Sequence, residues 1–157
     1  MPSPAHAAEL DRLLWRAAEE CESKEAWFGA GLPQLLRRTV EAEEAEDHAR
    51  SPDVAFVEVS AVSPQGSANT SEAPPSATCP VIALSTTGLE GLSSLIRSTG
   101  SGGVRVSRLI CPVAVFDFTA EGVRVREIRH GLTAADLQRR LSVPLWAGPD
   151  LKELGTH

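Results

Sequence analysis

Glu58 lies near the end of an apolar segment, residues 53–62 (DVAFVEVSAV), whose many β-branched residues predict a β-strand. Ligands of α/β proteins bind beyond the carboxyl ends of strands, and Glu58 is close to such an end. Burial in apolar surroundings raises the pKa of a carboxyl group, which would suit Glu58 to proton transfer. The alternative is a structural role, either at a sheet edge or in an ion pair with one of the arginines.

Two further polar side chains, Asn69 and His130, lie in predicted loops or turns. Asn69 could donate a hydrogen bond to a substrate carbonyl, although asparagine also serves turn geometry. His130 precedes Gly131 in a turn and could reach a substrate, and the alternative for it is a surface histidine.

The acidic segment 41–52 (EAEEAEDHARSP) carries several side chains that could in principle bind a metal ion. We interpret it as a solvated helix end, because a metal site needs ligands that converge from several elements. Cys21, Cys79 and Cys111 are widely spaced and form no CxxC pair, which predicts reduced thiols of a cytoplasmic protein. No metal site is therefore expected, and Cys111 is expected to be a buried, small apolar residue.

Helices and strands alternate in the predicted secondary structure. Apolar residues at helical spacing predict a helix over residues 5–22, and Pro33 suits the first turn of a second helix. Segment 88–103 is ambiguous, because leucines at helical spacing are mixed with Gly and Ser. Thr133 begins TAAD, a capping box that opens a last helix ending near Leu141. Apolar runs predict strands at 26–28, 53–62, 81–84, 104–110, 114–118 and 122–128, and the mixture indicates an α/β fold.

Length and composition fit one folded domain over residues 1–157, with the acidic segment at 41–52 and a Ser/Pro-rich loop at 63–80. The net charge of −6 argues against a general nucleic-acid binder, which carries a basic face. No apolar run approaches the roughly 20 residues that span a bilayer, so no membrane partner is expected. The first residues lack the basic and apolar regions of a secretory signal, which again favours the cytoplasm.

Ordered sequence blocks resemble the beta-type subunit of the class I CoA-transferase family. The most specific block is VAVFDF followed by HGLTAADL, within residues 111–137, and His130 stands where the family usually has Pro. The resemblance implies an α/β fold with a CoA-transferase-like (NagB/RpiA-like) sheet flanked by helices. The other blocks are GAGLP at 29–33, the strand and loop at 53–69, VIAL at 81–84 and the segment at 98–118.

One family block is missing. Class I transferases carry, after GxGxP, a Ser-Glu-Asn-Gly motif whose Glu is the covalent nucleophile, and residues 40–53 show nothing like it. Without that carboxylate, transfer of CoA by this chain alone is not expected. The resemblance still implies an acyl-thioester pocket, in which Glu58 would act as general base for hydrolysis, C–C cleavage or decarboxylation. No tightly bound cofactor is expected, and a CoA thioester would be the substrate.

The resemblance also implies substrate contacts. Gly29 and Gly31, in the turn closed by Pro33, could let backbone N–H groups reach a thioester oxygen as an oxyanion hole, and the alternative is a plain strand-to-helix turn. Asn69 and His130 complete the predicted substrate-binding set. Arginines could contact the CoA phosphates, with solvated or ion-paired roles as the default, and these are Arg105, Arg108, Arg124 and Arg126.

A partner subunit is implied as well, because family members place the active site between an alpha-like and a beta-like half. We therefore expect a beta-like subunit that works with an alpha-type partner as a heterodimer or heterotetramer. The alternative is a noncatalytic subunit that completes or stabilises a catalytic partner, and a stand-alone regulatory protein is a third possibility.

Overall fold

The computed structural model describes residues 4–22, 26–40, 53–68, 79–97 and 103–154. Its helices are α1 Pro4–Glu19, α2 Leu32–Thr39, the 3₁₀ turn η2 Leu89–Gly91, α3 Leu92–Leu95 and α4 Ala134–Arg139. Its strands are β1 Ala26–Phe28, β2 Val54–Glu58, β3 Ser67–Ala68, β4 Val81–Leu84, β5 Val104–Arg105, β6 Arg108–Cys111, β7 Ala114–Thr119, β8 Gly122–Ile128 and β9 Leu145–Glu153. None of the described helices is long and apolar enough to span a membrane.

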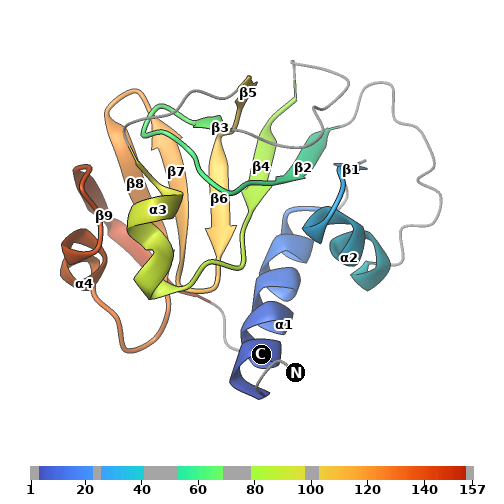
Figure 1. Cartoon of the computed structure of the whole chain (residues 1–157), viewed down its shortest axis with the longest axis horizontal. Coiled ribbons are helices and arrows are strands. Elements are labelled where there is room, and N and C mark those ends of the chain that lie inside the picture. Colours follow the sequence, from blue (N-terminus) through green and yellow to red (C-terminus); the bar gives the residue numbers. More distant parts are fainter. Residues whose placement is uncertain (1–3, 23–25, 41–52, 69–78, 98–102, 155–157) are drawn as a thin grey trace.

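Seven strands form one mixed, mostly parallel sheet in the order β1-β2-β4-β6-β7-β8-β9 (Figure 1). Strand β7 runs antiparallel to both of its neighbours, whereas all other adjacent pairs are parallel. The carboxyl ends of β1, β2, β4, β6 and β8 therefore meet at one edge of the sheet. Strands β3 and β5 form a separate antiparallel pair.

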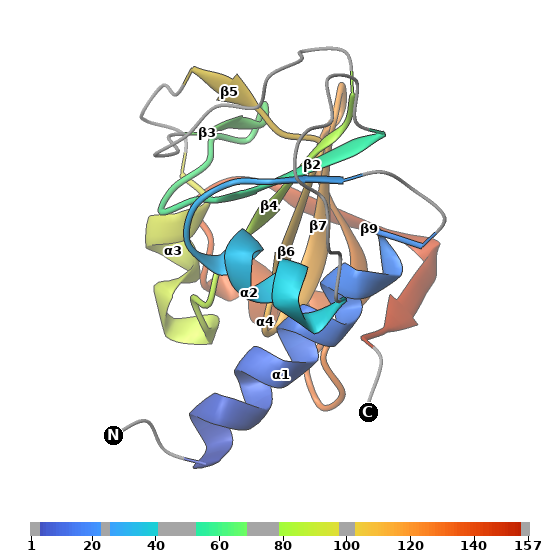
Figure 2. The same ribbon diagram turned by 90° about the vertical axis from the view of Figure 1, so that its right-hand side faces the viewer.

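Helices α1 and α2 cover one face of the sheet, as Figure 2 shows. The period of two along β2 assigns its residues to the two faces. Phe56 is fully buried in the cluster that contains residues of α1 and α2, whereas Val57 belongs to the cluster on the opposite face. This alternation places Glu58 on the same side of β2 as Phe56.

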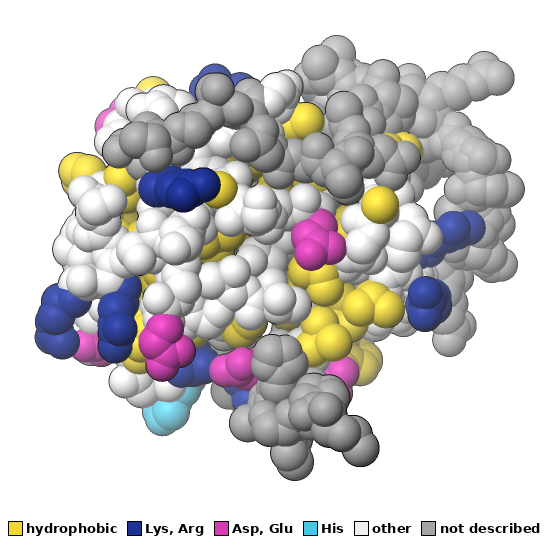
Figure 3. Space-filling view, viewed as in Figure 1, with side chains coloured by type: hydrophobic (Ala, Val, Ile, Leu, Met, Phe, Trp, Pro, Cys, Tyr) yellow, Lys and Arg dark blue, Asp and Glu magenta, His cyan; other side chains and the backbone are white. Residues whose placement is uncertain are grey.

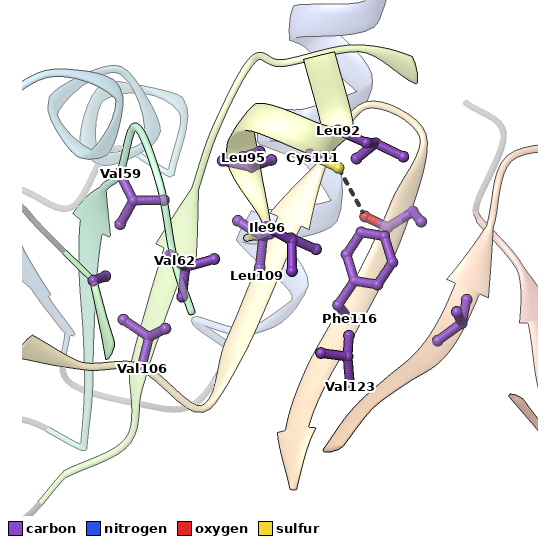
Figure 4. Close-up of a cluster of buried hydrophobic side chains, with 14 of the residues drawn as sticks. Val59, Val62, Leu92, Leu95, Ile96, Val106, Leu109, Cys111, Phe116 and Val123 are labelled. Atoms are coloured by element: carbon purple, nitrogen blue, oxygen red, sulfur yellow. Dashed lines mark hydrogen bonds between the residues drawn. The ribbon is translucent and has the colours of Figure 1, made fainter. Parts of the chain in front are cut away.

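The opposite face is covered by α3, α4 and the β3–β5 pair. Figure 4 shows its core, in which Leu92, Leu95 and Ile96 pack over the strands. Cys111 is fully buried there, and its thiol lies 3.5 Å from the carbonyl oxygen of Ala114. The prediction that Cys111 is a buried, small apolar residue is confirmed.

Most elements lie where the sequence predicts them. The second helix contains Pro33 in its first turn, and the ambiguous segment 88–103 contains η2 and α3. The capping box at Thr133 is present: the Thr133 hydroxyl accepts from the Asp136 N–H at 3.2 Å, and the Asp136 carboxylate accepts from the Thr133 N–H at 2.9 Å. The fold is α/β, with a central sheet flanked by helices.

Three details correct the prediction. The strand expected at 53–62 ends at Glu58. The strand expected at 104–110 is two strands, β5 and β6, because Val106 donates to Gly66 while Ser107 donates to Val81, so that the chain passes from one sheet to the other. Strand β9 was not predicted at all, since Gly148 and Pro149 interrupt its apolar pattern.

Candidate functional site

The turn between β1 and α2 contains three of the predicted site residues. The Gly29 N–H donates to the Phe56 carbonyl at 3.0 Å, so it extends the sheet pairing and is not available to a substrate. Gly31 is the N-cap of α2 and has φ +84°, a conformation that favours glycine. Pro33 is buried in the first turn of α2. Of this turn, Ala30 and Gly31 are exposed.

Glu58, the last residue of β2, lies directly against this turn. Its Oε1 accepts a hydrogen bond of 2.9 Å from the backbone N–H of Leu32 at the start of α2. The carboxylate therefore stabilises the amino end of a helix whose N-cap side chain, a glycine, supplies no acceptor. The position of Glu58 at the carboxyl edge agrees with the prediction, but the expected burial is wrong, because the side chain is exposed.

This arrangement can perform a specific kind of chemistry. It places a carboxylate, which can accept a proton, next to an exposed turn, whose backbone N–H groups can hydrogen-bond an oxygen that gains negative charge. Carbonyl substrates need both functions at once when water or another group adds to them. The same geometry also satisfies a purely structural requirement, the capping of α2.

Replacing Gly31 by Ala tests how tightly the turn and Glu58 fit together. A Cβ at position 31 would collide with Oε1 of Glu58, and the φ of +84° would be strained for alanine. We expect Gly31→Ala to lower the free energy of unfolding by about 2 kcal/mol, measured by urea denaturation.

A matched variant separates the two costs of that change. Gly131 has φ +93° but open space where a Cβ would stand, so Gly131→Ala carries the dihedral strain alone. Gly31→Ala should be the more destabilising of the two, and adding Glu58→Ala should recover part of the difference. Equal losses for the two glycine variants would contradict the contact with Glu58.

The remaining predicted substrate-binding residues do not join this cluster. His130 follows β8 and is exposed, with Nδ1 2.6 Å from a carboxylate oxygen of Glu153. It lies at the same sheet edge as Glu58, but β2 and β8 are four strand spacings apart, roughly 19 Å at about 4.8 Å each. One small acyl group cannot contact both side chains. Asn69 and the acidic segment lie outside the described residues.

Two of the arginines suggested for CoA phosphates are engaged in ion pairs. Arg108 binds Asp117, with Nε 2.6 Å from Oδ1, and also contacts Glu20 at 2.8 Å. Arg126 lies 3.5 Å from the same Asp117 carboxylate. Two carboxylates hold the Arg108 guanidinium and one contacts Arg126, so both positions have the ion-paired role that was given as the default.

The two other arginines differ from each other. The Arg124 guanidinium stacks over the Trp146 ring, 4.6 Å from its centroid. Arg105 is exposed on β5.

Trp146 is 38% exposed and Trp15, on α1, is 55% exposed. Figure 3 shows further apolar side chains gathered at the surface beside α1 and α2. Exposed apolar surface of this kind is typical of a surface that another protein covers.

The cysteines are free thiols, and Cys111 is the most deeply buried of them. Burial raises its pKa to about 11, so the thiol is not ionised at neutral pH and is a poor nucleophile. Within the described ranges, no three His, Cys, Asp or Glu side chains converge as a metal ion would require.

Gln34 was not predicted as a site residue from the sequence, yet its side chain is hydrogen-bonded to the turn that lies against Glu58. Its side-chain amide donates to the carbonyl oxygens of Phe28 and Gly29, at 3.1 and 3.0 Å. The only signal in the sequence is a polar residue directly after GAGLP, which by itself indicates nothing more than a helix surface position.

The whole architecture is similar to that of known proteins. No family model and no curated protein matches the chain. The solved structure of the decarboxylase AibA/AibB superposes with a TM-score of 0.69 and 13% identity, over 95% of this chain and 89% of that chain. IpdAB of Rhodococcus jostii RHA1 gives a TM-score of 0.64 and 13% identity, over 96% of this chain and 88% of that one.

A third similar structure is a longer protein. The acyl-CoA transferase YdiF of Escherichia coli O157:H7 gives a TM-score of 0.67 and 15% identity, over 92% of this chain but 43% of the transferase. Identities this low establish the fold and nothing finer. The chain therefore has a CoA-transferase-like fold, as the sequence blocks implied.

Proposed function

We propose that this chain is the beta-like subunit of a heteromeric, cytoplasmic CoA-transferase-like enzyme that acts on an acyl thioester, with an alpha-type subunit as its partner. Hydrolysis, C–C cleavage or decarboxylation is its reaction, rather than transfer of CoA. The observation that carries the proposal is the contact between Glu58 and the turn of Gly31, at the sheet edge where α/β proteins bind ligands.

The similar structures support the CoA-transferase-like fold, the partner subunit and the thioester substrate in this proposal. AibA/AibB is named as a decarboxylase of two components, and YdiF as an acyl-CoA transferase that has also been solved as a thioester complex with CoA. The match with AibA/AibB covers nearly all of both chains. The absence of a Ser-Glu-Asn-Gly block from the sequence argues against covalent CoA transfer.

The residues present can support hydrolysis without a covalent intermediate. Glu58 would take a proton from water as the water oxygen adds to the thioester carbonyl carbon. The carbonyl oxygen gains the negative charge and accepts hydrogen bonds from the exposed turn. The C–S bond then breaks, and its electron pair leaves on the CoA sulfur, which is protonated.

Decarboxylation would use the same turn. When a substrate carries a carboxylate on the α-carbon, the carbon bonded to the thioester carbonyl carbon, the bond between that carboxylate and the α-carbon breaks and carbon dioxide leaves. The electron pair of this bond moves onto the carbonyl oxygen as an enolate. The turn N–H groups would stabilise that oxygen, and a proton then adds to carbon. Neither reaction requires a tightly bound cofactor.

A noncatalytic role is the second candidate, and one observation favours it. Glu58 is exposed and already caps α2, so its carboxylate has a structural function without any substrate. Under this hypothesis the chain completes or stabilises a catalytic partner.

Co-expression with the protein encoded beside this chain tests the proposal. We expect the two chains to co-purify as a heteromer, with the mass determined by light scattering. The complex, but neither chain alone, should release free thiol or carbon dioxide from members of an acyl-CoA panel. A complex that binds no acyl-CoA and turns none over would contradict the proposed function.

A further inference from the structure

Gln34, the third residue of α2, donates hydrogen bonds to three carbonyl groups of the turn. Its Nε2 donates to Phe28 O and Gly29 O, and its backbone N–H donates to Gly31 O at 2.9 Å. Because both side-chain contacts are to carbonyl oxygens, the amide nitrogen must face the turn, and both of its hydrogens are used.

These contacts fix the direction of two N–H groups. In a trans peptide the N–H points away from the preceding carbonyl, and the described residues contain no cis peptide. Since Gly29 O and Gly31 O both point to Gln34, the N–H groups of Ala30 and Leu32 point away from it. The hydrogen bond of 2.9 Å from the Leu32 N–H to Oε1 of Glu58 agrees with this direction.

The Ala30 N–H is the second member of this pair. Ala30 is exposed, and its N–H has no hydrogen-bond partner in the part of the chain that the structure describes. It belongs to the peptide group two positions before the one that contacts Glu58. Both N–H groups therefore point to the side of the turn on which the Glu58 carboxylate lies.

We propose that Gln34 is a positioning residue that holds the Ala30 N–H in place as a donor for the thioester oxygen of the substrate. The role rests on the proposed function, and Gln34 itself does not touch the substrate. Without its amide, the Gly29–Ala30 peptide group loses the hydrogen bond to its carbonyl oxygen, and the dihedral freedom of Gly29 lets the group rotate. The donor is then lost at the moment when charge develops on the oxygen.

The test follows the Ala30 amide by NMR in the assembled complex, with this chain labelled with ¹⁵N-alanine, during a titration with acetyl-CoA. We expect acetyl-CoA to shift the Ala30 amide proton in the unsubstituted protein, and Gln34→Leu to abolish at least half of that shift. For the thioester that the complex turns over, kcat should fall by about tenfold or more, with KM changed less than about twofold.

Gln138→Leu is the matched control. The side-chain amide of Gln138 also bonds main-chain groups: its Nε2 donates to Val143 O at 2.9 Å, and its Oε1 accepts from the Leu145 N–H at 2.8 Å. These contacts lie at the end of the sheet remote from Glu58. It should leave the Ala30 response and kcat unchanged. Gln34→Glu provides a second variant of the same shape, whose carboxylate cannot donate to two carbonyls at neutral pH, and it should behave like Gln34→Leu.

The outcomes distinguish the two proposals. An Ala30 shift and a kcat that both Gln34 variants leave unchanged would overturn the role of Gln34 and leave the proposed function standing. An Ala30 amide that does not respond in a complex that turns over an acyl-CoA would also overturn the role of Gln34 alone. A complex that binds no acyl-CoA and turns none over would overturn the proposed function, and the role of Gln34 with it.

Discussion

Replacing Glu58 by Gln is expected to lower the turnover of the assembled complex by about 10²- to 10⁴-fold, the usual contribution of a general base. The substitution keeps the shape of the side chain and an oxygen that can accept from the Leu32 N–H, now 2.9 Å away. It removes only the capacity to take a proton. The loss should therefore appear in kcat, measured as thiol or carbon dioxide release, while the complex remains intact by light scattering.

Two further variants show whether the loss of turnover comes from the missing base at position 58. Glu58→Ala removes both the base and the acceptor for Leu32, so it should also reduce stability by about 1 kcal/mol, the usual value of a helix cap. Glu121→Gln changes an exposed carboxylate in the β7–β8 turn, at the opposite edge of the sheet, and should leave kcat unchanged. Full activity of Glu58→Gln in an intact complex would favour the noncatalytic subunit.

The fold could be predicted where local pattern decides structure. Alternation along β2 assigns Phe56 and Val57 to opposite faces, and Thr133 marks the start of α4 correctly. Strand β9 could not be predicted, because it pairs with β8 only near its two ends and carries Gly148 and Pro149 at the interruption. Proline within a strand is tolerated at a sheet edge, and only the tertiary structure shows that β9 lies there.

The candidate site was predictable in position but not in environment. The sequence places Glu58 at a strand end, yet its exposure depends on where β2 stops and on how α2 approaches it. The contact with Leu32 joins residues 26 positions apart, which no local pattern encodes. Gln34 is harder still, since nothing in the sequence shows that its amide folds back onto Phe28 and Gly29.

The ion-pair network around Arg16 could not be predicted from the sequence either. Removing the Arg16 charge is the substitution with the largest expected effect on stability. Arg16 is only 7% exposed, where α1 crosses the sheet. Its guanidinium binds Glu127 through Nε at 2.8 Å and Nη2 at 2.6 Å, and binds Glu20 through Nη1 at 2.8 Å. Glu20 in turn binds Arg108, which binds Asp117, so one chain of charges joins α1 to β6, β7 and β8.

Arg16→Met should lower the free energy of unfolding by about 3 kcal/mol, because it leaves two largely buried carboxylates without their shared cation. Met keeps most of the apolar stem, so packing changes little. Urea denaturation at pH 7 measures the loss. Arg139→Met is the control: Arg139 pairs with Asp136 at 3.3 Å, but its side chain is 74% exposed, and the change should stay below about 1 kcal/mol.

Acidification tests the same network without a mutation. Burial alone would raise the pKa of Glu20, but the hydrogen bond and charge of Arg16, together with Arg108, outweigh it and hold that pKa below its ordinary value of 4.5. A lowered pKa in the folded state means that the stabilisation is complete above 4.5 and is lost as the pH falls through the folded-state value. Arg16→Met removes one of the two cations, so its stability should fall less steeply over that acidic range than that of the unsubstituted protein. Identical acid profiles for the two proteins would show that the Arg16–Glu20 pair does not stabilise the fold, whatever Glu127 contributes.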